Sequence, residues 1–487
     1  MAEQVDNVSI TILVEKVKNK VLYAEAGNDF VEVLFSFLTL PLGTISRLMA
    51  TKESNIKQVL FGSISSLYKS VYKLDEQYLW SKTCKDMLLS PTNSMESWQN
   101  IKLNIDDTSP LKSYFLCKKE HCSVENRVCV SYFRNQKCKC GKLLNREKPR
   151  NLKKYGFFND TSTFIVSDDL FVMPNLIGTS LNLLQKHGIN DLDTIDKQTI
   201  NISKKEVVDL LKLSFFSKTP LSDFMFKKEQ FVGNLDPRNQ LECWIGKKKE
   251  KSNIMVVKVV RRKSNKQILF VEAEEDFADF LFSFLTFPLG AVLRMLQGFS
   301  FLCSIHNLYK SVTELSSSNG LMSQELKDLL TNPPVSRQFE LRSQILPICK
   351  NDYKEYFKSY NFVDPKSPIS GGYVNGGITF MVTDDLDVTP MSSIDGISYL
   401  EKMKVPINDV EEIVINIGQR EGLSILKASL TSTTSVLTNS LNQYIGSRAA
   451  QPDLSSIASL KDWPLKKSSL CLLRFISFIC YPYLKER

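Results

Sequence analysis

Alternating apolar and polar residues open the chain and predict a β-hairpin. Residues 8–14 and 21–26 form two such runs, separated by a polar turn at residues 16–20. Successive side chains of a strand point to opposite faces, so this alternation is typical of strands with one buried face. A second pair of runs, at residues 254–260 and 268–273, has the same pattern. We therefore expect a second hairpin there.

Each hairpin is followed by a segment that predicts a buried helix. The apolar positions of the first segment repeat every three or four residues, at Phe30, Val33, Leu34, Phe37 and Leu38. Side chains with this spacing share one face of a helix. Asp29 opens the segment and Glu32 follows three residues later, so we expect Asp29 to cap the helix and Glu32 to reach back to the cap. Pro41 ends or bends the helix, because proline has no amide hydrogen to donate.

Further helices are predicted at residues 56–74, 173–187 and 204–215, and a short strand at residues 163–166. Helices and hairpins are thus mixed without a regular β–α–β alternation. Such a mixture is typical of the α+β class, in which helices pack against antiparallel strands. We therefore predict an α+β fold.

The two halves of the chain repeat these patterns. Residues 21–49 align without a gap to residues 268–296, with 15 identities in 29 positions. Later matches follow in the same order, such as FIVSDDLFVMP at residues 164–174 and FMVTDDLDVTP at residues 380–390. Ordered matches of this kind indicate an internal duplication. We expect two tandem repeats, each a β-hairpin followed by helices and further short strands.

One segment of the first repeat has no counterpart in the second. The offset between matching residues falls from 242 at Phe115 to 216 at Phe164, so about 26 residues are unique to the first repeat. This cysteine-rich, basic insertion lies at about residues 116–150. We predict four parts along the chain: repeat unit 1 at 8–227, a linker at 228–252, repeat unit 2 at 253–443 and a C-terminal tail at 444–487.

The composition is that of a globular protein, with 43% hydrophobic and 24% charged residues among 487, and it excludes a disordered or collagen-like chain. The net charge of +9 is not spread evenly. Residues Lys112–Lys154 contain 13 Lys or Arg and three Glu, a net charge of +10, so the rest of the chain is close to neutral. A basic segment of this kind suits nucleic acid or an acidic protein as a partner, or is a solvated loop.

Inside this basic segment, a stretch of 24 residues contains five of the eleven cysteines. In a chain without a secretory signal, clustered cysteines are first read as metal ligands. Cys117 and Cys122, together with Cys138 and Cys140, offer the four thiolates that a structural zinc ion requires. Their spacings, C-x4-C and C-x-C, differ from a pair of C-x2-C motifs, so a loop of ordinary reduced thiols is the alternative. Two further candidate ligands are Cys129 and His121.

The sequence shows neither a secretory signal nor a membrane span. The first ten residues lack a basic flank followed by an apolar core. The longest apolar stretches, Val31–Gly43 and Phe280–Gly290, are shorter than the roughly 20 residues that a spanning helix needs. Leu470–Leu484 is also short, and Arg474 in its middle argues against a tail anchor. We expect an intracellular protein, cytoplasmic or nuclear, that is not secreted and has no transmembrane segment.

Familiar catalytic motifs are missing from the sequence. It has no phosphate-binding loop, dinucleotide-binding fingerprint, H-E-x-x-H motif or nucleophile elbow, and its three histidines are scattered. The acidic pair Asp168–Asp169 recurs as Asp384–Asp385. Paired carboxylates bind divalent cations or perform acid–base chemistry, but aspartates after a strand more often hydrogen-bond to the backbone of a turn. The glycine-rich segment Gly371–Gly377 is expected to be a flexible hairpin or turn.

Several blocks of the sequence resemble a known family. These are the paired segments YAEAGNDFVEVLFSFLTLPLG and VEAEEDFADFLFSFLTFPLG, the block from Cys117 to Cys138-Lys-Cys140-Gly141, VSDDLFVMP, TDDLDVTP and LKLSFFSKTPL. Together they resemble the plant family known as domain of unknown function 674, over about residues 8–440. That family has no established activity or catalytic residues, so the resemblance implies kinship and a plant source without implying a reaction. The tail after residue 444 does not match the family's pattern.

These observations favour a non-enzymatic binding or interaction protein, with a structural zinc site in repeat unit 1. Two alternatives stay open. The first is a nucleic-acid-binding protein that uses residues 112–154, in which Tyr132 and Phe133 stack on bases and binding depends steeply on salt. The second is an enzyme that uses the repeated Asp pairs, which requires both pairs to converge in a deep pocket. The sequence identifies no specific ligand, partner or oligomeric state.

Overall fold

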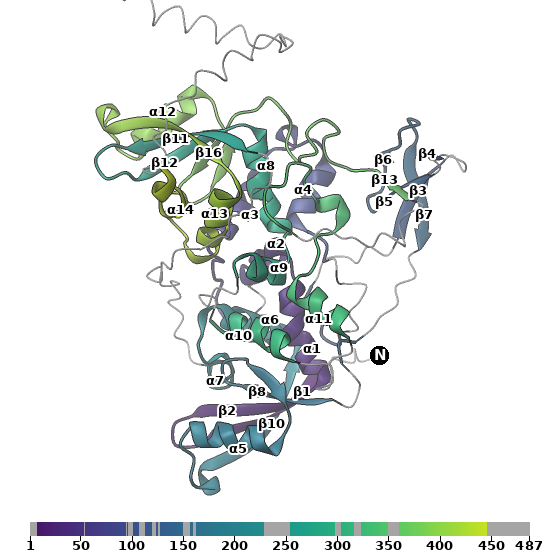
Figure 1. Cartoon of the computed structure of the whole chain (residues 1–487), viewed down its shortest axis with the longest axis vertical. Coiled ribbons are helices and arrows are strands. Elements are labelled where there is room, and N and C mark those ends of the chain that lie inside the picture. Colours follow the sequence, from purple (N-terminus) through teal and green to yellow (C-terminus); the bar gives the residue numbers. More distant parts are fainter. Residues whose placement is uncertain are drawn as a thin grey trace, which may run out of the picture. The chain divides into compact units, whose positions relative to one another are not determined.

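A computed structural model describes residues 7–52, 54–93, 95, 101–106, 113–118, 123–124, 127–149, 156–158, 162–227, 254–297, 303–315, 323–348 and 360–445. Residues Met1–Gln443 form one compact unit. Helices and antiparallel strands are mixed throughout it, so the predicted α+β class is confirmed (Figure 1). The predicted linker at 228–252 and the tail beyond residue 445 lie outside the described residues, and the proposed repeat boundaries stay a prediction.

Two five-stranded sheets have the same strand order. The first has the order β10-β1-β2-β8-β9 and the second the order β16-β11-β12-β14-β15, and every pairing in both sheets is antiparallel. The strands of the first sheet are β1 (Asn7–Glu15), β2 (Lys20–Gly27), β8 (Thr163–Ser167), β9 (Val172–Pro174) and β10 (Ile195–Ser203). Those of the second are β11 (Met255–Arg262), β12 (Ile268–Ala273), β14 (Phe380–Thr383), β15 (Val388–Pro390) and β16 (Val410–Ile417).

The hairpins that open the two sheets follow directly from the alternation in the sequence. Along β1 every second residue, from Val8 to Val14, is at most 3% exposed, whereas Ser9 between them is exposed. Burying such an apolar row fixes the register of a strand, since a slip by one residue would turn the row towards water. β1 pairs with β2 and β11 with β12, so both predicted hairpins are confirmed.

Fourteen helices and six 3-10 turns of the described chain surround the sheets. The helices of the first half are α1 (Asn28–Ser36), α2 (Leu42–Met49), α3 (Ile64–Lys73), α4 (Lys82–Leu89), α5 (Ile177–Lys186), α6 (Lys204–Phe216) and α7 (Pro220–Met225). Those of the second half are α8 (Glu275–Ser283), α9 (Leu289–Met295), α10 (Cys303–Glu314), α11 (Gln324–Thr331), α12 (Ser393–Lys402), α13 (Gln419–Thr431) and α14 (Val436–Ile445). The 3-10 turns are η1 (Phe37–Thr39), η2 (Glu76–Tyr78), η4 (Leu192–Thr194), η5 (Phe284–Thr286), η7 (Arg337–Phe339) and η8 (Ile407–Asp409).

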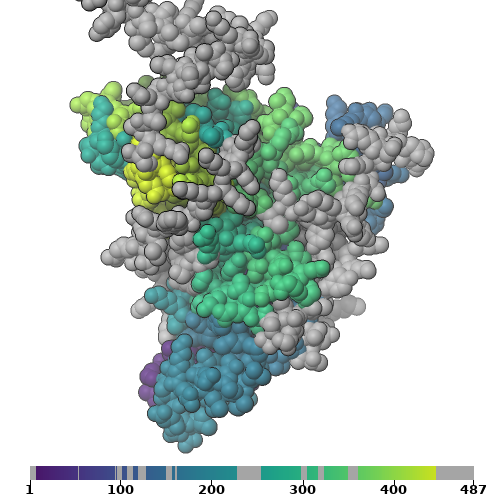
Figure 2. All heavy atoms as spheres, in the orientation of Figure 1, coloured from purple at the N-terminus to yellow at the C-terminus, as the bar shows by residue number. Residues whose placement is uncertain are grey.

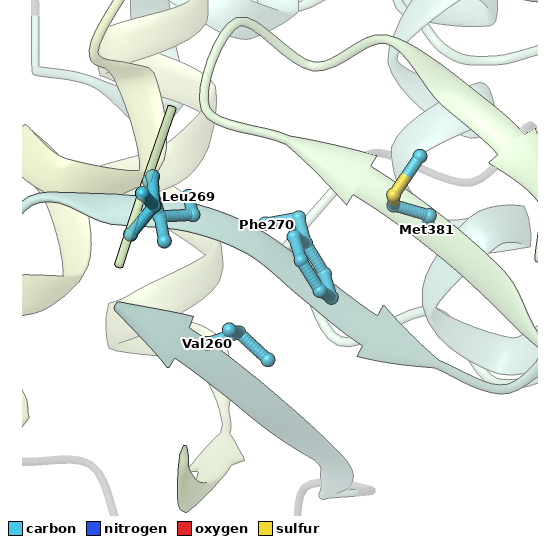
Figure 3. Close-up of a cluster of buried hydrophobic side chains, with 5 residues drawn as sticks. Val260, Leu269, Phe270 and Met381 are labelled. Carbon is cyan, nitrogen blue, oxygen red and sulfur yellow. The ribbon is translucent and has the colours of Figure 1, made fainter. Parts of the chain in front are cut away.

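One helix covers the outer face of each sheet. Leu183 and Leu184 of α5 pack against Leu22 and Tyr23 of β2. In the second sheet, α12 packs in the same way on a cluster that includes Val260, Phe270 and Met381, from three neighbouring strands (Figure 3). Removing this apolar surface from water stabilises each sheet on the side that the main core does not reach.

The two halves meet through the same segment of each. Pro41 and Pro288 form an antiparallel bridge, in which the Leu42 amide donates to Phe287 O at 3.0 Å. The Leu289 amide donates to Leu40 O, also at 3.0 Å. The apolar Thr-x-Pro-Leu-Gly motif of each half therefore pairs with its own counterpart.

Each half also contributes a helix to the other. Ser70 on α3 accepts a hydrogen bond from the Val388 amide of β15 at 2.9 Å. At the matching place, Ser311 on α10 accepts one from the Val172 amide of β9 at 2.8 Å. Both serines are buried, so the Val172 and Val388 amides of these short edge strands each gain a partner from the opposite half of the chain.

A third sheet contains the cysteine-rich segment. Its strands are β3 (Ser113–Cys117), β4 (Ser123–Val124), β5 (Arg127–Ser131), β6 (Gln136–Lys137), β7 (Leu143–Pro149) and β13 (Tyr360–Phe362). The order is β13-β5-β3-β7-β6, and β4 also pairs with β5. The edge strand β13 comes from the second half of the chain, and Figure 1 shows it in green among blue strands. We call residues 113–149 together with β13 the cysteine module.

The predicted cap of the first helix is wrong. Gly27, not Asp29, is the N-cap of α1, and no side chain caps it. Glu32 is 5% exposed and accepts a hydrogen bond from the Phe157 amide at 2.6 Å instead of reaching back along its own helix. The Glu32 carboxylate, which the local spacing predicted to cap the helix, therefore binds a loop far along the chain instead.

Candidate metal centre

Two strand ends and one tight turn bring the thiols of the cysteine module together. Cys117 ends β3 beside a β-bulge, and Cys138 begins the turn that joins β6 to β7. In this turn the Cys138 amide donates to Lys142 O and the Gly141 amide donates to Cys138 O, both at 2.8 Å. Gly141 has a φ of +80°, a left-handed conformation that glycine adopts without steric cost. The turn therefore places Cys140 on the same side as Cys138.

Three of the four predicted metal ligands converge. The Sγ atoms of Cys117, Cys138 and Cys140 all lie within 4.8 Å of one another, and those of Cys117 and Cys140 are 3.5 Å apart. Four thiolates around a zinc ion at about 2.3 Å lie roughly 3.8 Å from one another, so these three thiols are close enough together to bind one metal ion. Among the described residues, this is the one group of three or more His, Cys, Asp or Glu side chains close enough to hold a metal ion.

The fourth predicted ligand, Cys122, lies outside the described residues, as does His121. Cys129, the other additional candidate, is fully buried in the cluster formed by Cys117, Cys138 and Leu144. Burial raises the pKa of Cys129 to about 11, and its hydrogen bond with Cys138 and the charges of the neighbouring thiols act in the same direction. All the candidate ligands that the structure describes in this module are cysteine sulfur atoms, which are soft ligands that suit zinc.

The surface of the module is strongly basic. Seven described cations of residues 113–149 are exposed, whereas Glu147 is the one described acidic residue of this range. The cations are Lys118, Arg134, Lys137, Lys139, Lys142, Arg146 and Lys148. Lys139 and Lys142 flank the thiols, where positive charge offsets the negative charge of a thiolate cluster.

The two aromatic residues that the sequence offered for base stacking are packed within the protein. Tyr132 is 9% exposed, and its ring lies 5.3 Å from that of Tyr114 and 5.2 Å from that of Phe362. Phe133 packs against Phe339. Sequence reasoning missed Tyr360 and Phe362, which β13 brings to the module from more than 200 residues away.

The acidic pairs are built into turns. Asp168 accepts hydrogen bonds from the amide and hydroxyl of Ser222, both at 2.8 Å, and Asp384 accepts the same two from Thr438. The following residues, Leu170 and Leu386, have φ values of +61° and +63°. Each pair thus ties a sheet turn to the start of a helix, as the turn interpretation predicted.

Two buried carboxylates on α1 and α8 hold matching loops. As Glu32 does for Phe157, Asp279 accepts hydrogen bonds from the Tyr373 and Val374 amides at 2.7 and 3.0 Å. Tyr373 lies in the glycine-rich segment and is fully buried, and its carbonyl accepts from the Trp80 amide at 2.9 Å. The first part of the glycine-rich segment, residues 371–374, is therefore buried and tied by hydrogen bonds, whereas Gly376 and Gly377 are exposed.

The stability of the chain is expected to fall as pH rises from 5 to 7.5. Burial raises the pKa of Asp168 and Asp384 to about 6 and that of Asp279 to about 7, from an ordinary 3.8. In this window the folded state keeps protons that the unfolded state has released. The resulting stabilisation is complete below the unfolded pKa and is lost as pH rises through the folded pKa values.

Urea titrations at several pH values would measure this trend. We expect the free energy of unfolding to drop by at least about 1 kcal/mol from pH 5 to 7.5. The Asp168→Asn/Asp384→Asn variant should show a flatter profile. A wild-type profile that instead rises with pH, and more steeply than that of the variant, would mean that hydrogen bonds keep these carboxyl groups ionised.

A surface hollow of about 480 Å³ is lined by residues of the 52–58 segment and contains neither acidic pair.

In the parts of the chain that the structure describes, no helix has the length and apolar character needed to span a bilayer.

Comparison with known proteins identifies a family. No curated protein and no solved structure matches the chain. The family described as Protein of unknown function (DUF674) matches residues 4–420, a range that includes every strand of both five-stranded sheets and the whole cysteine module. Because this match covers most of the chain, the protein belongs to the DUF674 family.

Proposed function

We propose that the chain is a non-enzymatic binding protein whose cysteine module is held together by one structural zinc ion. The observation that carries this proposal is the convergence of Cys117, Cys138 and Cys140 within 4.8 Å. The six strands of the module are short, and its buried cluster is small. A small sheet of this kind gains much of its stability from a metal, because ligands that are separated in the sequence are tied at one point.

The proposed ligands are Cys117, Cys122, Cys138 and Cys140. Cys129 competes with Cys122 for the fourth position, since its thiol contacts Cys138 within the same cluster. Serine substitution separates the two candidates. Replacing the cysteine that is the ligand should remove most of the bound zinc from the protein. Replacing the other cysteine should leave the zinc content unchanged.

Metal content tests the proposal directly. The full chain is required, because β13 completes the module from the second half. We expect about one zinc ion per chain in protein purified without chelator, and its loss from the Cys138→Ser/Cys140→Ser variant. Cys84→Ser is the matched control, since Cys84 is a buried cysteine outside the module and should leave the zinc in place. Folded, reduced protein without zinc would refute the metal site.

The non-enzymatic part of the proposal is supported by the acidic pairs. The first aspartate of each pair uses its carboxylate oxygens on a neighbouring helix, and burial raises the pKa of both. Substitution of either pair should therefore change the free energy of unfolding, because it removes hydrogen bonds that tie the turn to a helix.

A further inference from the structure

The third sheet is a composite of two distant segments of the chain. β13 pairs in parallel with β5, with Tyr360 opposite Val128 and Phe362 opposite Val130. Figure 2 shows the blue atoms of the module next to green atoms from the second half of the chain. β13 therefore adds two aromatic residues to a face that residues 113–149 alone would leave incomplete.

The register of the sheet places these rings on the face opposite the thiols. Asn361, between the two rings, is paired with Cys129, and the thiol cluster packs against Val363 and Phe115. Neighbouring residues of a strand point to opposite faces, so Tyr360 and Phe362 point away from the thiols. Tyr114 on β3 joins them, with ring centroids 6.1 Å from Tyr360 and 6.3 Å from Phe362.

Cations lie on the same face as these rings. Lys148 is directly opposite Tyr114 and Arg146 directly opposite Leu116, and residues opposite each other in a ladder share a face. Lys148 Nζ lies 6.0 Å from the centre of the Tyr360 ring, and the Arg337 guanidinium lies 5.4 Å from that of Phe362. All three cations are exposed, whereas the three rings are partly exposed.

We propose that this aromatic–basic face, formed by Tyr114, Tyr360, Phe362, Arg146, Lys148 and Arg337, binds single-stranded nucleic acid. The proposal specifies the partner of the binding protein proposed above. Single-stranded nucleic acid is recognised by rings on which bases stack, next to cations that neutralise the phosphates. An acidic protein would need the cations but not the rings. A base pair in a duplex keeps its faces covered by its neighbours, so a duplex would also leave the rings unused.

Fluorescence anisotropy with the full chain tests this proposal. The probes are fluorescein-labelled single-stranded RNA and single-stranded DNA of mixed sequence, a duplex hairpin, and a poly-glutamate peptide. We expect the single strands to bind at least about tenfold more tightly than the hairpin or the peptide at 0.1 M salt. Binding should weaken with salt at a logarithmic slope of about −2, because three cations release counterions from a single strand.

Two pairs of substitutions separate charge from stacking. Arg146→Glu/Lys148→Glu should weaken binding about tenfold or more and make the salt slope shallower. Tyr360→Leu/Phe362→Leu keeps the strand apolar and should weaken binding about fivefold or more without changing the slope. Lys204→Glu/Lys205→Glu changes the charge equally at exposed positions on α6 and should change affinity less than twofold. Thermal unfolding of each variant identifies any that do not fold.

Other results would overturn the proposal. Equal binding of the poly-glutamate peptide, with no effect of the ring substitutions, would identify an acidic protein as the partner. Equal weakening by the control pair on α6 would show diffuse charge attraction, and no binding to single strands would exclude the partner altogether. Zinc is measured on the same preparation. Protein with zinc that binds no single strand refutes this inference alone, whereas zinc-free protein that binds refutes the metal site alone.

Discussion

Replacing Gly372 by alanine is expected to lower the free energy of unfolding by about 3 kcal/mol. An added Cβ would lie 1.6 Å from Asp279 Oδ2, which is far inside the contact distance. The carboxylate cannot move away without losing the hydrogen bonds from the Tyr373 and Val374 amides, and both it and Tyr373 are buried. The substitution therefore breaks the tie between α8 and the glycine-rich loop.

Urea denaturation measures the loss, and two other glycines calibrate it. Gly156→Ala should cost less, because its Cβ would lie 2.6 Å from Oε1 of Glu32, a longer side chain with more freedom to shift. Gly178→Ala adds its Cβ in open space within α5 and should be neutral or stabilise the chain by up to about 1 kcal/mol. A Gly372→Ala protein as stable as the Gly178→Ala protein would show that the loop is not held as described.

The Gly290→Ala substitution is expected to cost about 2 kcal/mol at the contact between the two halves. Its Cβ would lie 2.6 Å from Leu330 O and 2.9 Å from Pro333 Cδ of the same half, and 3.1 Å from Leu38 O, which is a backbone atom of the other half. Backbone oxygens in packed helices shift less easily than the end of a side chain. The matching Gly43→Ala should cost less, because its nearest atom, Leu285 O, would be 3.0 Å away.

Thermal unfolding followed by circular dichroism checks this prediction. Because residues 1–443 form one compact unit, we expect the Gly290→Ala protein to unfold at a lower temperature in a single transition. Two separate transitions, with only one of them shifted, would show that the halves unfold independently and that their contact contributes little.

The parts of the fold that sequence predicted are those specified by local pattern. The two hairpins and α6 were predicted because their alternation or helical spacing lies within one segment. The edge strands β10 and β16 were missed although they alternate, because they pair at the rim of each sheet and remain half-exposed along most of their length. Their apolar residues are thus diluted by charged ones, which weakens the pattern that indicates a strand.

The parts that sequence could not predict depend on partners far along the chain. Glu32 has the spacing of a capping residue, but its hydrogen-bond donor is Phe157, 125 residues later. The density of cysteines indicated a metal centre, and the fold brings Cys117 to Cys138 and Cys140 as expected. The aromatic–basic face could not be predicted, since no local feature of residues 360–362 indicates that they pair with β5.

The pairing of β13 with β5 also sets an order of events during synthesis. Phe362 leaves the ribosome 232 residues after Val130, its partner in the sheet. At typical rates of translation this delay is roughly 10 to 50 s, during which β5 is an open edge of a short, basic sheet. A zinc ion bound in that interval would hold the cysteine loops in place until the last strand arrives. A chain that stops before residue 360 would keep its cysteines but leave this edge unpaired.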